Sequence, residues 1–114
     1  MEQDSGLIKL STEYWRLLRL FEKAVKSQPF DKRSKGTAQL RYAQGRLKAI
    51  LEENGLRLIS YDQSPYSPNL PVTVVNEDDV CGNEGLMIEE TLEPTILAHG
   101  NVVTMGKVIL KQGG

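Results

Sequence analysis

The chain has 114 residues, of which 39% are hydrophobic and 25% charged, with one cysteine and a formal net charge of −1. This length predicts one domain, or two small layers sharing a core, and a single cysteine excludes an internal disulfide. Since no apolar run is long enough to span a bilayer and no basic-then-apolar leader begins the chain, we expect a cytoplasmic protein.

The two halves of the chain differ in charge. Residues 1–55 carry 11 basic and 7 acidic residues, a net charge of +4, whereas residues 56–114 carry 3 and 8, a net charge of −5. Such an asymmetry indicates either that the halves face different surroundings or, more simply, that both faces are solvated.

A first amphipathic helix is predicted near the N-terminus, ending at Pro29. Its apolar residues recur in heptad register at Leu7, Leu10, Tyr14, Leu17, Phe21 and Ala24, and Leu18 and Val25 widen the stripe. Ser11 or Thr12 would cap this helix, with an earlier start near Ser5 as the alternative. Trp15 and Leu20 lie off the stripe, so the helix has more apolar surface than one partner helix covers, which favours a homodimer.

A second helix is predicted to begin near Ser34–Thr37, after a charged loop. Its apolar positions share one face of a helix and are Leu40, Ala43, Leu47, Ile50 and Leu51. Asn54-Gly55 would end it, since glycine adopts the left-handed conformation at no steric cost, and Leu56 could then fold back onto Leu51. Two helices joined by a short loop predict an antiparallel hairpin.

The rest of the chain shows only short extended runs and turn residues. Strands are predicted at Leu56–Ile59, Val72–Val75, Leu86–Leu92, Ile96–Ala98, Val102–Met105 and Val108–Leu110. His99-Gly100-Asn101 would form a hairpin loop, with turns at Asn76–Asp79 and Cys81–Gly85. Gly106 would mark a bulge or kink. Lys107 and Lys111 would share one face of the last strand.

These patterns predict an α+β fold with two regions. Residues 1–55 would form a helical hairpin, half of a dimeric four-helix bundle, and residues 56–114 a small, mostly antiparallel β-domain. Within the second region, Pro65, Pro68 and Pro71 exclude regular helix and limit strand pairing.

The sequence lacks the residue patterns that are typical of catalytic and metal-binding sites. The sequence has no phosphate-cradling glycine loop, no paired metal-ligand spacing and no nucleophile elbow. A Cys81–His99 dyad lacks a third group to orient it, and Glu77-Asp78-Asp79 lacks the alternating ligands of a calcium loop. We therefore expect no enzyme activity, no metal and no cofactor.

Two further features admit a functional interpretation. The basic residues of the helical half could bind nucleic acid, although a solvated helix face is favoured; they are Arg16, Arg19, Lys23, Lys26, Lys32, Arg33 and Lys35. Gly113-Gly114 is typical of ubiquitin-like carriers, but those begin with a β-hairpin, so a flexible tail is favoured here.

Several motifs in a fixed order point to a known family. Gly55–Ile59 is a glycine followed by aliphatic residues, and Tyr66–Pro71 follows at the expected spacing. Phe21–Val25, Glu77–Val80 and Gly100–Leu110 match a bundle-helix motif, an acidic turn and a closing hairpin. In this order the motifs resemble the GrpE family, the nucleotide exchange factors of DnaK-type heat-shock chaperones.

The resemblance implies a stress-response co-chaperone that binds the ATPase domain of a DnaK-type chaperone, promotes ADP release and performs no chemistry itself. From the charges and the lack of a long apolar run, we expect no nucleic-acid or membrane partner. The implied partner-binding residues are Pro68, Asn69, Leu70, Thr104, Met105 and Lys107. The implied bundle or dimer residues are Leu17, Phe21, Leu40, Leu47 and Leu51.

The sequence also departs from the family pattern. Ser67 stands where the family has Asp, Pro71 where it has His, and Thr104 where the hairpin usually has Arg. Leu92–Pro94 replaces the usual Lys-Gly-Tyr, and we expect a short, diverged member without the family's long paired N-terminal helix. An adaptor that keeps the fold but has no exchange activity is the alternative, because fold alone does not determine function.

Overall fold

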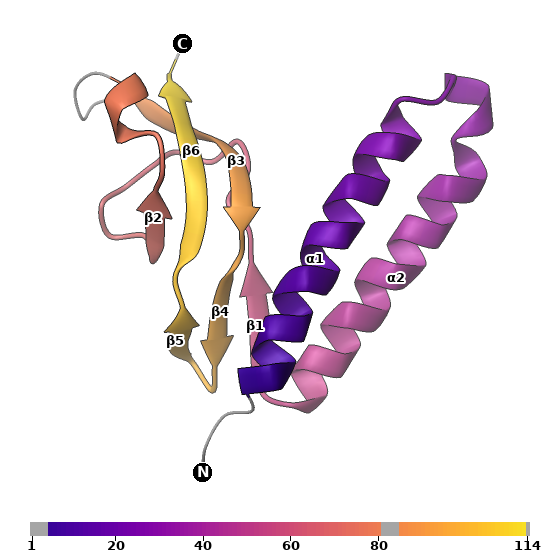
Figure 1. The fold of residues 1–114 in the computed structure, drawn as a ribbon, viewed down its shortest axis with the longest axis horizontal. Coiled ribbons are helices and arrows are strands. Elements are labelled where there is room, and N and C mark those ends of the chain that lie inside the picture. Colours follow the sequence, from indigo (N-terminus) through magenta and orange to yellow (C-terminus); the bar gives the residue numbers. More distant parts are fainter. Residues whose placement is uncertain (1–4, 81–84, 114) are drawn as a thin grey trace. The chain divides into compact units, whose positions relative to one another are not determined.

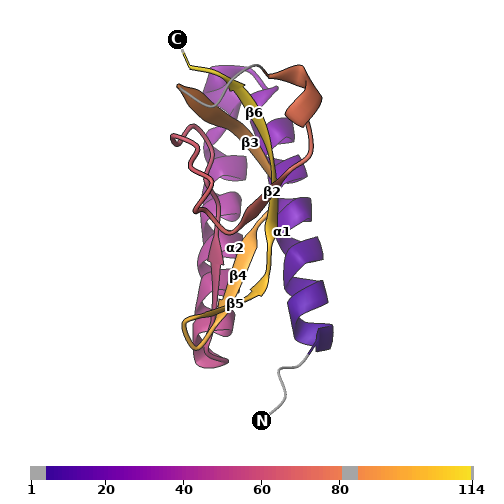
Figure 2. The same ribbon diagram turned by 90° about the vertical axis from the view of Figure 1, so that its left-hand side faces the viewer.

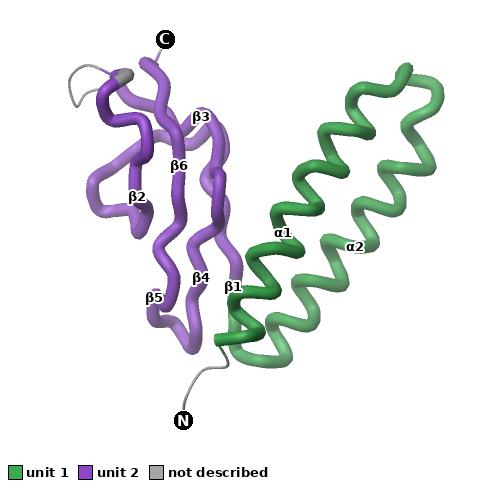
Figure 3. The backbone as a smooth tube through the Cα atoms, viewed as in Figure 1, with its two compact units in different colours: residues 1–57 green, residues 58–114 purple. Residues whose placement is uncertain are grey.

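The computed structural model describes residues 5–80 and 85–113 (Figure 1). The fold is α+β, as predicted: two helices packed as a hairpin are followed by two small, mostly antiparallel sheets. The chain forms two compact units, residues 1–57 and residues 58–114 (Figure 3).

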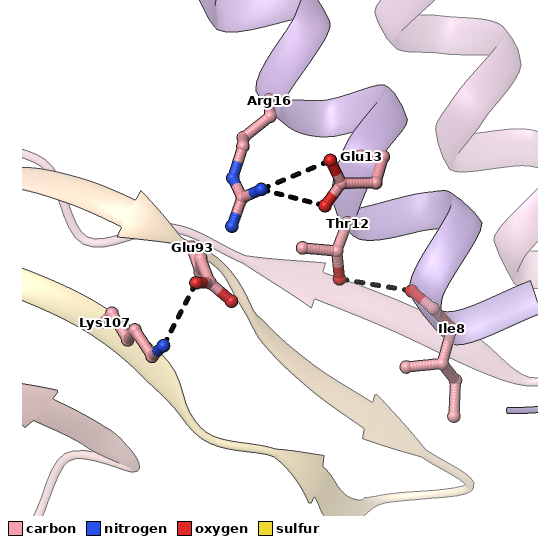
Figure 4. Close-up of polar contacts among 6 residues, drawn as sticks. All are labelled: Ile8, Thr12, Glu13, Arg16, Glu93 and Lys107. Carbon is pink, nitrogen blue, oxygen red and sulfur yellow. Dashed lines mark hydrogen bonds and ion pairs between the residues drawn. The ribbon is translucent and has the colours of Figure 1, made fainter.

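The first helix, α1, spans Ser5–Lys26, so the earlier of the two predicted starts is correct. Ser11 and Thr12 do not cap the helix, because both lie inside it. The Ser11 hydroxyl donates to the Leu7 carbonyl at 2.7 Å. The Thr12 hydroxyl donates to the Ile8 carbonyl at 3.1 Å (Figure 4). This bond to the preceding turn satisfies a hydroxyl in mid-helix without a cap.

A compact turn joins the two helices. It contains the 3₁₀ helix η1, Phe30–Lys32, which follows Pro29, and α2 then begins at Ser34. The Arg33 guanidinium closes the end of α1 by donating to the carbonyls of Gln28 and Lys26, both at 2.8 Å. These bonds satisfy carbonyls that have no partner within the helix.

The second helix, α2, spans Ser34–Glu53 and ends as predicted. Gly55 has a φ of 72°, the left-handed conformation expected after the helix stop. The Asn54 side chain donates to the Ile50 carbonyl at 2.8 Å. Between the helices, a Cβ on Gly36 would lie 2.8 Å from Cγ2 of Val25, so this glycine allows close approach.

The described strands form two three-stranded sheets, in the orders β1-β4-β5 and β2-β6-β3. Their bounds are β1 Leu56–Ile59, β2 Val72–Val74, β3 Leu86–Glu93, β4 Thr95–Ala98, β5 Asn101–Thr104 and β6 Gly106–Gln112. The segment Glu77–Asp79, predicted as a turn, is a 3₁₀ helix, η2. Both views show β3 and β6 side by side (Figures 1 and 2). β6 pairs antiparallel with β3 but parallel with β2.

Residues from these paired strands form a core inside residues 58–114. The buried members are Val72, Leu86, Ile88, Val108 and Leu110, and the half-buried residues packed on them are Tyr61, Tyr66, Leu70, Val74 and Val80. Lys107 and Lys111 alternate with buried Val108 and Leu110 along β6, so they share the opposite face, as predicted.

Hydrogen bonds from residues outside the strands extend the β2-β6-β3 sheet on both sides. The side-chain amide of Asn76, just after β2, bonds to Leu110 through both of its polar atoms. Its nitrogen donates to the Leu110 carbonyl and its oxygen accepts from the Leu110 backbone amide, both at 2.8 Å. Along the other side of the sheet, Ile88 pairs with the proline-rich segment, its amide donating to Ser64 and its carbonyl accepting from Gln63, both at 2.8 Å. These contacts protect parts of two strand edges.

The predicted hairpin between β4 and β5 is present. His99 and Gly100 both have positive φ, 50° and 86°, as in the two-residue turns that match the twist of antiparallel strands. Asn101 belongs to β5, so the loop is one residue shorter than predicted. Within the described residues, no helix is both long and apolar enough to cross a bilayer.

Candidate partner-binding surface

The structure brings the two predicted halves of the partner-binding surface together. The proline-rich corner ends at Pro71 and the β5–β6 connection ends at Gly106, and the Gly106 amide donates to the Pro71 carbonyl at 3.2 Å. The next residue of the corner, Val72, pairs with Gly106 in the parallel β2–β6 register. The ends of the two segments that carry the predicted contact residues therefore lie side by side, although they are about 35 residues apart in the chain.

Thr95 fixes this junction. Its hydroxyl donates to the Pro71 carbonyl at 2.7 Å and accepts from the Gly106 amide at 3.2 Å, and the residue is fully buried. A buried hydroxyl bonded on both sides holds the two segments in one geometry, because breaking either bond leaves a buried polar group unsatisfied.

Residue 106 must be glycine because the junction leaves no room for a Cβ atom. A Cβ there would lie 2.7 Å from Oγ1 of Thr95 and 2.9 Å from both the Glu93 carbonyl and the Thr95 amide nitrogen. The sequence analysis predicted a bulge or kink at Gly106. No register shift of the β3–β6 pair falls at this residue, since both lie on β3, between Ile88 and Glu90 and between Thr91 and Glu93. The glycine is explained by close backbone approach instead.

The corner before Pro71 is itself a compact turn. The Ser67 hydroxyl accepts from the Asn69 amide at 3.3 Å, and the Ser67 carbonyl accepts from the Leu70 amide at 3.0 Å. Pro68 and Asn69 are exposed at the tip, whereas Leu70 packs against the core. A hydroxyl that accepts two residues onward forms the same kind of turn as an aspartate, so the departure at Ser67 keeps this local geometry.

Apolar side chains are exposed beside the corner. Val102, Val103 and Met105 expose 46%, 40% and 48% of their surface. Val102 and Val103 are consecutive on β5, where the β4–β5 register shifts, and β5 lies at the end of its sheet order. The sequence analysis included Met105 but missed the two valines. The missed signal was a strand without a charged residue on either face.

Lys107, the remaining predicted contact residue, is paired within the same sheet. Its ammonium lies 3.3 Å from the Glu93 carboxylate, and the two residues face each other in the β3–β6 register (Figure 4). The Lys107 side chain is 51% exposed, so this is a surface ion pair of small energetic value. Lys107 is accessible, but it is not an isolated cation.

The predicted bundle residues fall into two groups. Leu40, Leu47 and Leu51 are buried on α2. On α1, however, Leu17 and Phe21 are 65% and 37% exposed. The three leucines of α2 can therefore hold the hairpin together, whereas Leu17 and Phe21 of α1 are available to a partner.

The heptad stripe of α1 is divided in the same way. Its covered side consists of Leu7, Tyr14, Leu18 and Val25, and its exposed side of Leu10, Leu17, Phe21 and Ala24, with Leu20 beside it. Two adjacent rows of apolar residues looked like one wide buried face, because the sequence does not say which row faces the second helix. Trp15, off the stripe, is half-buried, with Arg19 5.0 Å from its ring centroid.

Several basic residues of α1 have partners on the same helix. The Arg16 guanidinium contacts the Glu13 carboxylate at 2.9 Å (Figure 4), and Arg19 and Lys26 lie 3.9 and 3.7 Å from Glu22. These pairs lower the positive potential along the helix available to a nucleic acid.

The structure describes no cluster of metal-ligating side chains within residues 5–80 and 85–113. His99 is exposed in the β4–β5 turn, and Cys81 lies outside the described residues together with most of the predicted Cys81–Gly85 turn. The Cys81–His99 pair therefore stays untested.

The sequence matches no protein-family model, and no curated protein matches it either. The resemblance to the GrpE family rests on the motifs described above and stays a prediction.

Proposed function

We propose that this chain is a GrpE-like nucleotide exchange factor that binds the ATPase domain of a DnaK-type chaperone and promotes ADP release. The observation that carries the proposal is the junction at Pro71 and Gly106. There the ends of the two sequence segments that resemble the family's chaperone-binding motifs are joined by the hydrogen bond between Gly106 and Pro71, and the Thr95 hydroxyl bridges them.

The surface suits binding to another protein. Val102, Val103 and Met105 supply exposed apolar area, and Pro68 and Asn69 supply an exposed, more polar border. Interfaces between proteins combine an apolar centre with a polar rim in this way. Because Thr95 already orders the junction, little conformational entropy is lost when a partner binds.

The exchange activity follows from differential affinity. The chain must bind the open, ADP-releasing form of the ATPase domain more tightly than the closed form, and it then shifts the population toward the open form. By linkage, ADP must weaken binding of this chain by the same factor by which this chain weakens binding of ADP.

We also propose a homodimer that forms through α1. Leu10, Leu17 and Phe21 are spaced seven and four residues apart, so they lie on one face of the helix, and Leu20 lies beside them. Leu10, Leu17 and Leu20 are each more than 60% exposed. A second copy would remove this apolar row from water, and each large side chain buried in this way contributes roughly 1.5–3 kcal/mol.

The proposal is tested by the release of fluorescent ADP from the cognate DnaK-type chaperone in a stopped-flow experiment. We expect faster release at saturating chain, with the acceleration lost in Val102→Glu and Met105→Glu. Val75→Glu is the matched control, since Val75 is 50% exposed but follows β2 at the end away from Pro71. If saturating chain binds the chaperone without accelerating release, the chain is an adaptor and the exchange proposal is wrong.

A further inference from the structure

The end of the helical hairpin carries an exposed aromatic ring within a basic stretch of sequence. Phe30, the first residue of η1, is 85% exposed, the highest value among the exposed large hydrophobic residues of the described chain. Figure 1 shows this turn beyond the last turn of α1 and the first of α2. Residues 23–35 contain five basic residues and one acidic residue, a net charge of +4.

The ring is held in place. The Arg33 guanidinium lies 5.8 Å from the centroid of the Phe30 ring, and its nitrogens donate to the carbonyls of Lys26, the last residue of α1, and of Gln28, just after it. The amide of Lys32 donates to the Pro29 carbonyl at 2.8 Å. Phe30 is therefore presented outward by a hydrogen-bonded turn that is ordered before any ligand arrives.

The surrounding cations point to an anionic ligand. Lys32 and Lys35 are exposed close to the ring in sequence, and the Lys26 side chain is 71% exposed. Lys26 lies 3.7 Å from Glu22, a weak surface pair that does not fix its position. An exposed apolar group with cations close to it in sequence combines burial of the ring with electrostatic attraction to negative charge.

We propose that this tip, Lys26–Lys35, binds the surface of an anionic lipid bilayer, with Phe30 inserted at the level of the headgroups. This activity goes beyond the proposed exchange function and does not depend on it. A flat surface can receive a single protruding ring with cations around it. Single-stranded nucleic acid is instead held by a groove with successive stacking platforms, whereas this tip offers one ring at the end of a hairpin. Binding at the surface needs no membrane-spanning helix.

The test is sedimentation of the full chain with vesicles of phosphatidylcholine alone and with roughly one third phosphatidylglycerol. We expect binding to the anionic vesicles only, weakening as salt screens the charges. Phe30→Ala should weaken binding roughly tenfold, because the ring is no longer buried. Tyr42→Ala is the control: Tyr42 is 72% exposed on α2, outside the tip, and should leave binding unchanged.

The contribution of charge is tested separately. Lys32→Gln combined with Lys35→Gln should weaken binding roughly twenty-fivefold, about fivefold for each charge removed. Arg46→Gln combined with Lys48→Gln removes the same charge from exposed positions more than ten residues into α2, and should have a much smaller effect. A variant Phe30→Trp in a Trp15→Phe background should show an emission shift to shorter wavelength on binding, as the ring leaves water.

Three results would overturn the proposal. The first is no binding to anionic vesicles at low salt. The second is equal loss of binding in the Phe30→Ala and Tyr42→Ala variants, which would mean that the tip is not the contact. The third is binding of a single-stranded oligonucleotide, dependent on Phe30 and Lys32, without binding to vesicles, which would assign the tip to nucleic acid instead.

Discussion

Gly106→Ala tests the junction on which the proposed binding surface depends. The added methyl group would lie 2.7–2.9 Å from Oγ1 of Thr95, the Glu93 carbonyl and the Thr95 amide nitrogen. Two of these atoms belong to the backbone of the β3–β4 connection, so the chain itself must move by roughly half an ångström to restore ordinary contact. Overpacking of this kind costs about 1–3 kcal/mol.

Hydrogen bonding adds to this cost. The Gly106 amide donates to both the Pro71 carbonyl and the Thr95 hydroxyl, and weakening these bonds costs about 1 kcal/mol. Alanine reduces the entropy of the unfolded chain and returns about 0.4–1 kcal/mol. The net destabilisation is therefore about 1–3 kcal/mol, which lowers the unfolding midpoint by roughly 5–15 °C.

The measurement is thermal unfolding of the full chain followed by circular dichroism. Gly45→Ala is the control: Gly45 lies inside α2, and none of the described atoms would be within 4 Å of its Cβ. Alanine should stabilise that helix position by up to about 1 kcal/mol. An unfolding midpoint for Gly106→Ala at or above that of the unmodified chain would refute the reasoning.

Three further changes probe other contacts. Thr95→Val removes the buried hydroxyl and should cost about 1–2 kcal/mol, with faster hydrogen exchange at the Gly106 amide, whereas Thr95→Ser should leave that exchange rate unchanged. Asn76→Ala removes two hydrogen bonds to Leu110 and should cost about 1–3 kcal/mol in denaturant unfolding; an unchanged midpoint would contradict the sheet-extending role. Leu17→Glu should convert the proposed homodimer to a monomer in sedimentation equilibrium, while Tyr42→Glu should not; if both variants keep the mass of the unmodified chain, the α1 row is not the dimer contact.

The elements of this fold could be predicted where their signals are local. Gly55 ends α2 because one residue needs a positive φ, and the pair His99 and Gly100 marks the β4–β5 turn for the same reason. The alternation along β6 placed Lys107 and Lys111 on one face without knowledge of the partner strands. Such signals depend on a few neighbouring residues, so a sequence records them directly.

The features that could not be predicted depend on residues far apart in the chain. The parallel pairing of β2 with β6 joins segments more than 30 residues apart, and the need for glycine at 106 arises from Thr95 and Glu93. The same limit explains why the division of the α1 stripe into a covered and an exposed row could not be predicted: periodicity gives the direction of each row, but not the position of the partner helix. Ser11 and Thr12 were misplaced because a hydroxyl can either cap a helix or bond back within it.

The candidate surface was predicted in part. The resemblance supplied Pro68–Leu70 and Thr104–Met105 from separate motifs, and the structure brings them together through the contact between Pro71 and Gly106. Val102 and Val103 were missed because apolar residues in a strand are expected to be buried unless the edge is known to be open.

The central claim is tested most directly by measuring how tightly the chain binds the ATPase domain of the cognate DnaK-type chaperone, by calorimetry, without nucleotide and with saturating ADP. The account predicts tighter binding without nucleotide, and a ratio of the two affinities equal to the factor by which this chain weakens binding of ADP. Equal affinities in the two conditions, or no binding in either, would contradict it.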